Sequence, residues 1–152
     1  MPAELEPSGL LRGDGKGPDG STLTPWARGK CLVWDFTSPG TLAQSHLQQS
    51  SLAVGSAALA AEAKKRTKYD QLARSSIFVP FVIESLGAWG QEALAFSSEL
   101  GSRVAEKTGE RRSTAFFRQR MIVAIQKGNA ASVRGTLKDF VSSGERDYIF
   151  QL

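Results

Sequence analysis

Two aspartates and two lysines are spaced so that they could act on a phosphodiester. Asp19 lies in a Pro-Asp-Gly sequence just before a predicted strand, and Asp35 lies inside the most apolar predicted strand. Lys65 and Lys68 follow on a predicted helix. Carboxylate oxygens are ligands that Mg²⁺ or Mn²⁺ prefers, and such an ion acidifies a bound water and neutralises charge on a phosphate. A nearby lysine stabilises the transition state or orients the water. The residue types favour metal-dependent hydrolysis.

The strand over residues 30–37 (KCLVWDFT) fixes the face on which Asp35 lies. With alternation of period two, Asp35 shares one face with Val33, whereas Trp34 and Phe36 point to the other. Such an aspartate is expected to be at least partly buried, and burying an unpaired carboxylate costs several kcal/mol. We therefore expect Asp35 to contact a cation, a metal ion or strong hydrogen-bond donors.

The lysines lie on one stripe of the helix predicted over residues 49–74. That stripe, with steps of four and three residues, comprises Val54, Ala58, Ala61, Lys65, Lys68 and Leu72. Its apolar members form a packing face small enough for close approach to a sheet, while Lys64 and Arg66 point elsewhere, toward solvent. The carboxylates and the two lysines could then converge at one end of the sheet. The alternative is structural: Asp19 only begins a turn, and Asp35 forms an ion pair with Lys65.

Hydrophobic patterning predicts a small α/β fold of the α+β kind. Residues 22–26 and 30–37 indicate a hairpin, and residues 77–85 (IFVPFVIES) a further strand, although Pro80 inside it lacks a ladder donor. Further helices are predicted over residues 90–107 and 113–127, and from Asn129, with Gly128 ending the second of them. We expect a mixed sheet of three to four strands flanked by helices, with a helical C-terminal half.

A division of the chain follows from these elements. Residues 1–18 are rich in proline and glycine and predict a flexible, extended or loop segment. Residues 19–85 would form the α/β core, and residues 86–152 a helical part of the same domain.

Composition indicates one compact intracellular domain. The 152 residues are 41% hydrophobic and 22% charged, which argues against a disordered or collagen-like chain. A single cysteine, Cys31, excludes an intramolecular disulfide and a thiolate zinc cluster. No apolar run approaches the roughly 20 residues that cross a bilayer, so we expect no membrane association.

The net charge of +4 is concentrated in two clusters, residues 64–68 (KKRTK) and residues 111–120. Such clusters suit a phosphate backbone, and a solvated helix face accounts for them equally well. The candidate DNA contacts are Lys64, Arg66, Arg111, Arg112, Arg118 and Arg120. Phe116 and Phe117 lie among the arginines, and we expect both rings to pack inward.

Other notable residues have ordinary interpretations. His46 is expected on the surface or as a helix cap, and Cys31 as an inert small hydrophobe. Glu62 is predicted to form a salt bridge on the helix surface, with a role as a further metal ligand as the alternative. The three tryptophans are expected to anchor the core or loops rather than to stack on bases; they are Trp26, Trp34 and Trp89.

The acids and lysines together resemble the PD-(D/E)xK nucleases. In the common form of that motif a lysine follows the second acid by two residues, where this chain has Thr37. The sequence resembles the restriction-endonuclease-like domain at the C-terminal end of some non-LTR retrotransposon polyproteins, in which a Lys-x-x-Lys-Tyr motif on the following helix supplies the lysine. Residues 65–69 (KRTKY) match it. Four stretches resemble segments of retroelement-derived reading frames of animal genomes, across most of residues 12–137: DGKGPDGSTLTPW, LVWDFTSPGTLAQSHL, AEAKKRTKYDQL and FFRQRMIVAIQKGNAAS.

This resemblance implies a restriction-endonuclease-like fold and a metal-dependent endonuclease that nicks DNA at an insertion target. Asp19 and Asp35 would bind Mg²⁺ or Mn²⁺, Lys65 or Lys68 would be the catalytic lysine, and Tyr69 would support them. The partner would be DNA, or RNA, and the location the nucleus.

Two alternatives stay open: a catalytically inactive nucleic-acid-binding remnant, and an orphan reading frame that folds poorly. Those relatives usually carry a basic residue where this chain has Gly17. The loss of that residue is what a decayed copy would show. Because 152 residues are too few for a reverse transcriptase, we expect a fragment of a polyprotein or a truncated copy.

Overall fold

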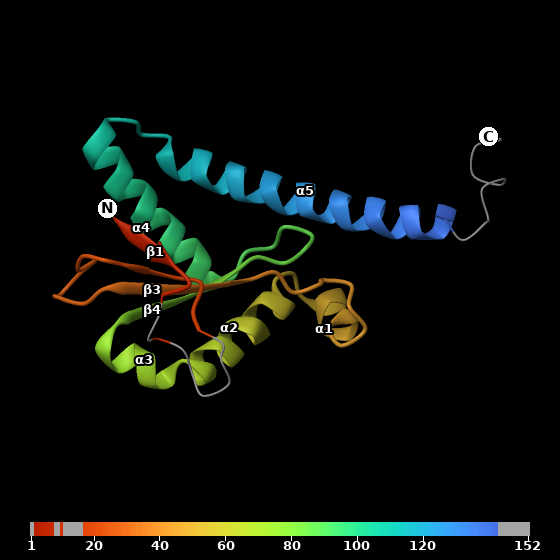
Figure 1. Cartoon of the computed structure of the whole chain (residues 1–152), viewed down its shortest axis with the longest axis horizontal. Helices are drawn as coiled ribbons and strands as arrows, with labels where there is room; N and C mark the ends of the chain where they lie inside the picture. Colours follow the sequence, from red (N-terminus) through yellow and green to blue (C-terminus); the bar gives the residue numbers. More distant parts are fainter. Residues whose placement is uncertain (1, 8–9, 11–16, 143–152) are drawn as a thin grey trace.

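The structure is a computed structural model, and it describes residues 2–7, 10 and 17–142. Within them, three strands are followed by three helices, a fourth strand and two long helices (Figure 1). They are β1 (Ala3–Leu5), β2 (Gly20–Thr22), β3 (Leu32–Thr37), α1 (Leu47–Leu52), α2 (Ser56–Lys68), α3 (Asp70–Ser75), β4 (Ile77–Val82), α4 (Gln91–Thr108) and α5 (Ser113–Ser142). The predicted α/β class and helical C-terminal half are confirmed.

The four strands form one mixed sheet in the order β1-β2-β3-β4. β1 and β2 pair antiparallel, as do β2 and β3, and the short connection at the end of the β2–β3 hairpin is closed by a bridge between Ala27 and Lys30. β4 runs parallel to β3, which requires the crossover made by α1, α2 and α3. The predicted antiparallel pairing is confirmed, but its first strand is Gly20–Thr22 and not residues 22–26. The segment expected to be extended or loop contains strand β1.

Pro80 is accommodated because it lies on an edge strand with its nitrogen facing outward. The N–H groups of Ile77 and Ile83 donate to β3, to the carbonyls of Cys31 and Thr37. Along a strand successive N–H groups point to opposite sides, so that of position 80 would point away from β3. The proline therefore removes no hydrogen bond from the β3–β4 ladder.

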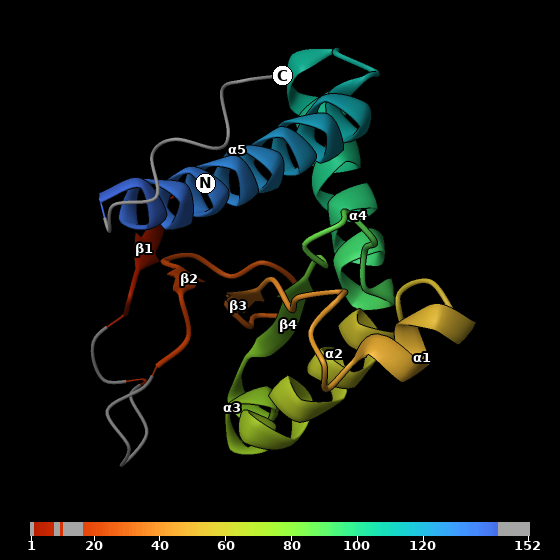
Figure 2. The ribbon, with the colours of Figure 1, turned by 90° about the vertical axis from the view of Figure 1, so that its right-hand side faces the viewer.

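Helices cover both faces of the sheet. Figure 2 shows α2 and α3 on one side of β3 and β4, and α4 and α5 on the other. Val33 and Phe78 pack with Tyr69 on the α2–α3 side, whereas Phe81 and Ile83 pack on the side of α4 and α5. The alternation of neighbouring strand residues thus fills two separate clusters, one on each face.

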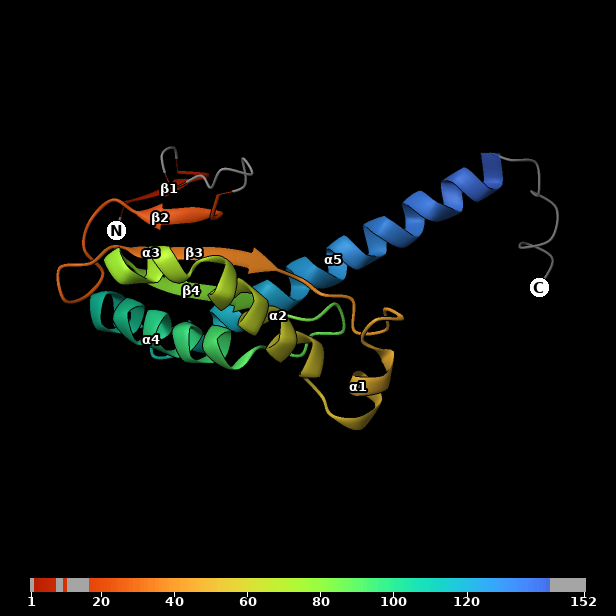
Figure 3. The same cartoon turned by 90° about the horizontal axis from the view of Figure 1, so that it is seen from below.

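The helices differ from those expected at two points. The helix predicted over residues 49–74 is three helices: Gly55, with a φ of 85°, separates α1 from α2, and Tyr69, with a φ of −110° and a ψ of 25°, separates α2 from α3. Val54, assigned to the packing stripe, is 92% exposed. Gly128 does not end a helix: α5 continues through it, and the Asn129 side chain donates to the Ser85 carbonyl instead of capping a new helix. The far half of α5 extends beyond the sheet (Figure 3).

Candidate functional site

The centre of the candidate site is an ion pair between β3 and α2. Asp35 is 3% exposed and lies on the face of the sheet that α2 covers. Its Oδ2 accepts a hydrogen bond from Nζ of Lys65. The Lys65 side chain is 19% exposed to solvent. A buried carboxylate needs such a cation, so the expected partner of Asp35 is present. Of the two candidate lysines, Lys65 is the one that contacts Asp35, so the ion pair expected under the structural alternative is present.

Asp19 lies at the same end of the β2–β3 pair. The register of β2 and β3 ends where Gly20 pairs with Trp34, and Asp19 is the exposed residue directly before Gly20. The Oδ2 atom of Asp19 accepts a hydrogen bond of 2.6 Å from the backbone N–H of Phe36, which fixes the carboxyl group beside β3.

Tyr69 ties the end of α2 to the segment that carries Asp19. The Tyr69 side chain is buried, and its hydroxyl donates to the carbonyl of Gly17 at 2.8 Å. The Nζ atom of Lys68 lies 4.6 Å from the centre of the Tyr69 ring. Lys68 therefore contacts the tyrosine, and Lys65 contacts the aspartate, so the two lysines have different neighbours.

The donor set at Asp19 and Asp35 suits a hard divalent cation. No group of three or more potential ligands from His, Cys, Asp and Glu occurs in the described part of the chain. Mg²⁺ is usually held by one or two carboxylates, with waters and substrate phosphate oxygens completing its shell. The hydrogen bonds of the two aspartates within the described residues involve Oδ2 of each. Carboxylate oxygens of this kind are the donors that Mg²⁺ or Mn²⁺ prefers.

Glu62 is not on the helix surface, and that prediction is wrong. It is 4% exposed, and Oε1 accepts hydrogen bonds from the backbone N–H groups of Glu92 and Ala93 at the start of α4. Burial raises the pKa of the Glu62 carboxyl group, while these N–H groups oppose the rise. The contacts show Glu62 capping α4, where Gly90 as N-cap offers no side chain.

Glu84 has a matching role that the sequence analysis did not consider. It is 1% exposed, and its two carboxyl oxygens accept hydrogen bonds from the Ala58 N–H and the Thr41 hydroxyl. The carboxylate thus caps the start of α2, the helix that carries Lys65. The one signal in the sequence was an acidic residue directly after an apolar strand.

The basic residues are only partly available to a phosphate backbone. Arg66, expected in solvent, forms a bidentate pair with Glu92, because the capping contacts of Glu62 bring the start of α4 close to α2. Arg118 donates to Ser97, Ser98 and the Leu94 carbonyl, and so joins α5 to α4 instead of facing solvent.

The other candidate DNA contacts lie at the surface. Arg112 pairs with Glu110 and lies over the Phe116 ring. Phe116 is 46% exposed, contrary to the expectation that both phenylalanines pack inward, because only the Phe117 side of α5 faces the core. The remaining members of the set, all exposed, are Lys64, Arg111 and Arg120.

The remaining sequence assignments are largely as expected. Trp26 is buried, and Trp34 and Trp89 pack against core clusters. Cys31 is a free, partly exposed thiol. His46 occupies the N-cap position of α1 without a side-chain cap hydrogen bond.

Comparison with protein-family models, with curated proteins and with solved structures finds no match for this chain. Among the helices of residues 17–142, none is both long and apolar enough to cross a membrane.

Proposed function

We propose that this chain is a metal-dependent endonuclease domain that nicks DNA by phosphodiester hydrolysis, of the restriction-endonuclease-like type found in non-LTR retrotransposon polyproteins. The observation that carries the proposal is the buried Asp35–Lys65 pair, together with the Asp19 carboxylate held against the same strand by the backbone N–H of Phe36. The Pro-Asp, strand Asp and Lys-x-x-Lys-Tyr segments of the sequence support it, because their side chains come together from three separate elements.

Each residue has a distinct role in the proposed reaction. Asp19 and Asp35 would hold Mg²⁺, which when bound acidifies a water and neutralises phosphate charge. Lys65 is held beside Asp35 and is partly open to solvent, so its ammonium can contact a non-bridging phosphate oxygen and stabilise the negative charge that develops there. Tyr69 positions Asp19 by anchoring Gly17, two residues before it.

Lys68 has a supporting role in this scheme. Its ammonium lies on the Tyr69 ring, and a cation so placed is attracted by the electron-rich face of the ring. It stabilises the orientation in which the tyrosine hydroxyl reaches Gly17. We therefore assign the catalytic amine to Lys65.

A plasmid-nicking assay tests the proposal. The purified chain is expected to convert supercoiled plasmid to the open circle with Mg²⁺ and to lose this activity in EDTA. Asp19→Asn and Asp35→Asn should each lower the rate at least about a hundredfold, because an amide is a poor ligand for the hard cation. Asp70→Asn is the matched control, since Asp70 is exposed and pairs with Arg74 on α3.

The outcomes separate the two leading interpretations. Loss of nicking in Asp35→Asn with an unchanged circular dichroism spectrum supports the endonuclease. Salt-sensitive DNA binding without cleavage under any divalent cation would contradict it and favour a nucleic-acid-binding remnant. Equal nicking by the wild type and both variants would show that the activity belongs to a contaminant.

A further inference from the structure

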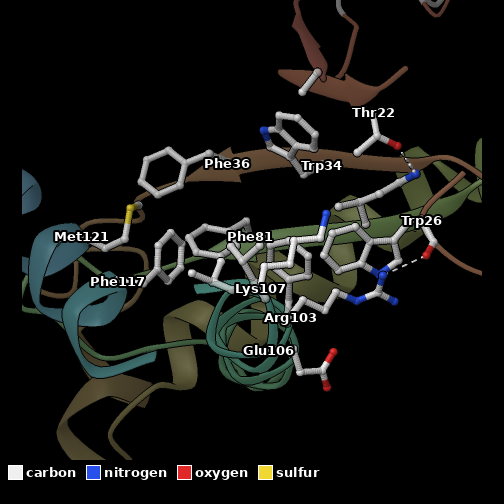
Figure 4. A pocket seen from close by; sticks show the side chains of 15 residues that line it. Thr22, Trp26, Trp34, Phe36, Phe81, Arg103, Glu106, Lys107, Phe117 and Met121 are labelled. Atoms are coloured by element: carbon white, nitrogen blue, oxygen red, sulfur yellow. Dashed lines mark hydrogen bonds between the residues drawn. The ribbon is translucent and has the colours of Figure 1, made fainter. Parts of the chain in front are cut away.

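An apolar cavity of about 640 Å³ lies on the other face of the sheet, between β2, β3 and the helices α4 and α5 (Figure 4). Its size falls within the range of about 300–1,000 Å³ that small-molecule sites occupy. Phe81 lies at its centre and contacts Phe96 and Phe117 edge to face, with ring centroids 6.0 and 6.2 Å apart. Trp34 and Phe36 of β3 line it from the strand side.

The aromatic walls are held in place by the surrounding fold. A Cβ atom at Gly20 would overlap the Trp34 ring, so the glycine in β2 allows the indole to lie close against the neighbouring strand. Trp26 is fixed by a hydrogen bond from its Nε1 to Glu99 at 2.8 Å and by the Arg103 guanidinium 3.9 Å from its ring centre. The aromatic side chains that line the cavity are therefore held in fixed positions by the fold.

Its polar groups are cationic and hydrogen-bond-donating. Figure 4 shows Lys107 extending from α4 toward the strand-side aromatic residues, while the Glu106 carboxylate points away from them. Arg103 is neutralised by Glu99, whereas no ion pair is found for Lys107 within the described residues. The indole N–H of Trp34 likewise has no acceptor in that part of the chain. The cavity offers aromatic faces with the ammonium of the exposed Lys107 beside them.

We infer that this cavity binds an unpaired nucleotide of a nucleic-acid strand, with the base among the aromatic rings and a phosphate at Lys107. Bases stack on aromatic side chains whatever their sequence, and cations beside such platforms hold the backbone. A nucleotide suits both features together, because its base can stack on the aromatic rings and its phosphate can pair with the Lys107 ammonium. The net charge of +4 adds to the attraction of a polyanion.

The site goes beyond the proposed endonuclease function, because it needs neither a metal ion nor cleavage. β3 nonetheless links the two sites: the Phe36 ring lines the cavity, and the backbone N–H of the same residue holds the Asp19 carboxylate. The two sites lie on opposite faces of the sheet, so each can be tested without the other.

Binding in EDTA, measured by fluorescence anisotropy, separates this inference from catalysis. A short labelled oligothymidylate is compared with an abasic strand of the same length, which keeps the phosphates and lacks the bases. We expect the abasic strand to bind about 5- to 150-fold more weakly, the range for loss of one stacked base. Phe36→Ala, at a 36% exposed position, should weaken oligothymidylate binding within the same range. Trp34→Ala is the second variant, used if its thermal unfolding shows a folded protein.

Lys107→Glu tests the charge, with Lys127→Glu as its control because Lys127 is an exposed helical lysine outside the cavity. Lys107→Glu should lower the slope of log affinity against log salt by about 0.7, the value for one phosphate contact on a single strand, whereas Lys127→Glu should not. Equal binding of the two strands, or the same effect from both lysine variants, would overturn the inference. Self-association lost in Phe36→Ala would overturn it too, in favour of a second copy.

Discussion

Lys65→Met is expected to lower the free energy of unfolding by about 3 kcal/mol. Removing one partner of a buried ion pair costs about 3–5 kcal/mol, because the other charge is left without compensation. Asp35 is 3% exposed, but the Lys65 side chain retains 19% of its exposure, so water reaches the pair and the lower end of that range applies. For a domain of this size the melting temperature should fall by about 10 °C.

The measurement is thermal and urea unfolding of four proteins: the wild type, Lys65→Met, Asp35→Asn and the double variant. Because the amide that Asp35→Asn introduces carries no charge to leave unpaired, the double variant should be more stable than the sum of the single changes implies, with a coupling of about 2 kcal/mol. Lys64→Met is the matched control, since Lys64 is the adjacent, exposed lysine, and its effect should stay within about 0.5 kcal/mol. A coupling below about 0.5 kcal/mol would refute the reasoning.

The same variant reports on the metal site. Without Lys65, both oxygens of Asp35 become open to a cation, so Mg²⁺ should restore part of the lost stability of Lys65→Met. At a concentration about tenfold above the dissociation constant, the gain would be about 1.4 kcal/mol. If Mg²⁺ stabilises neither Lys65→Met nor Lys64→Met, Asp19 and Asp35 do not hold the ion.

Three further predictions follow from contacts elsewhere in the fold. Burial raises the pKa of Glu62 above its usual 4.5, so the native state binds a proton more tightly than the unfolded state does. The free energy of unfolding should therefore rise as the pH falls from neutral toward 4.5. Urea unfolding should show this pH dependence in the wild type and not in Glu62→Gln. Tyr69→Phe removes the hydrogen bond to Gly17 and should cost about 1 kcal/mol in thermal unfolding, with a slower nicking rate because Asp19 is held less firmly; an unchanged nicking rate would contradict the positioning role. Gly101→Val should destabilise the protein by about 1–3 kcal/mol, because even a Cβ there would overlap Thr114 and force α4 and α5 apart; an unaltered melting temperature would contradict that packing.

The centre of the site could be predicted from the sequence because it depends on local periodicity. Alternation along residues 30–37 assigned Asp35 to the face opposite Trp34, and the three- and four-residue steps of the helix put Lys65 toward the sheet. Both contacts are observed. The position of Asp19 beside Phe36 could not be predicted, because it depends on the register of β2 against β3, which the hairpin connection sets.

The errors concern residues whose partners lie far away in sequence. Glu62 has the spacing of a surface salt bridge, and only the approach of α4, some 30 residues later, makes it a buried cap. Gly128 is typical of a helix end, but an exposed glycine costs only about 1 kcal/mol in a helix, which the flanking residues of α5 can offset. Tertiary context decided both cases.

The outward-facing nitrogen of Pro80 has a consequence for how copies of this chain could associate. A strand from another molecule that approached β4 would find a missing donor and a pyrrolidine ring midway along a six-residue edge. Sheet-to-sheet polymerisation through that side is therefore blocked by a single residue. An additional strand could pair with the other edge strand of the sheet, β1. Because β1 has only three residues, all exposed, it offers few backbone groups to a growing fibril.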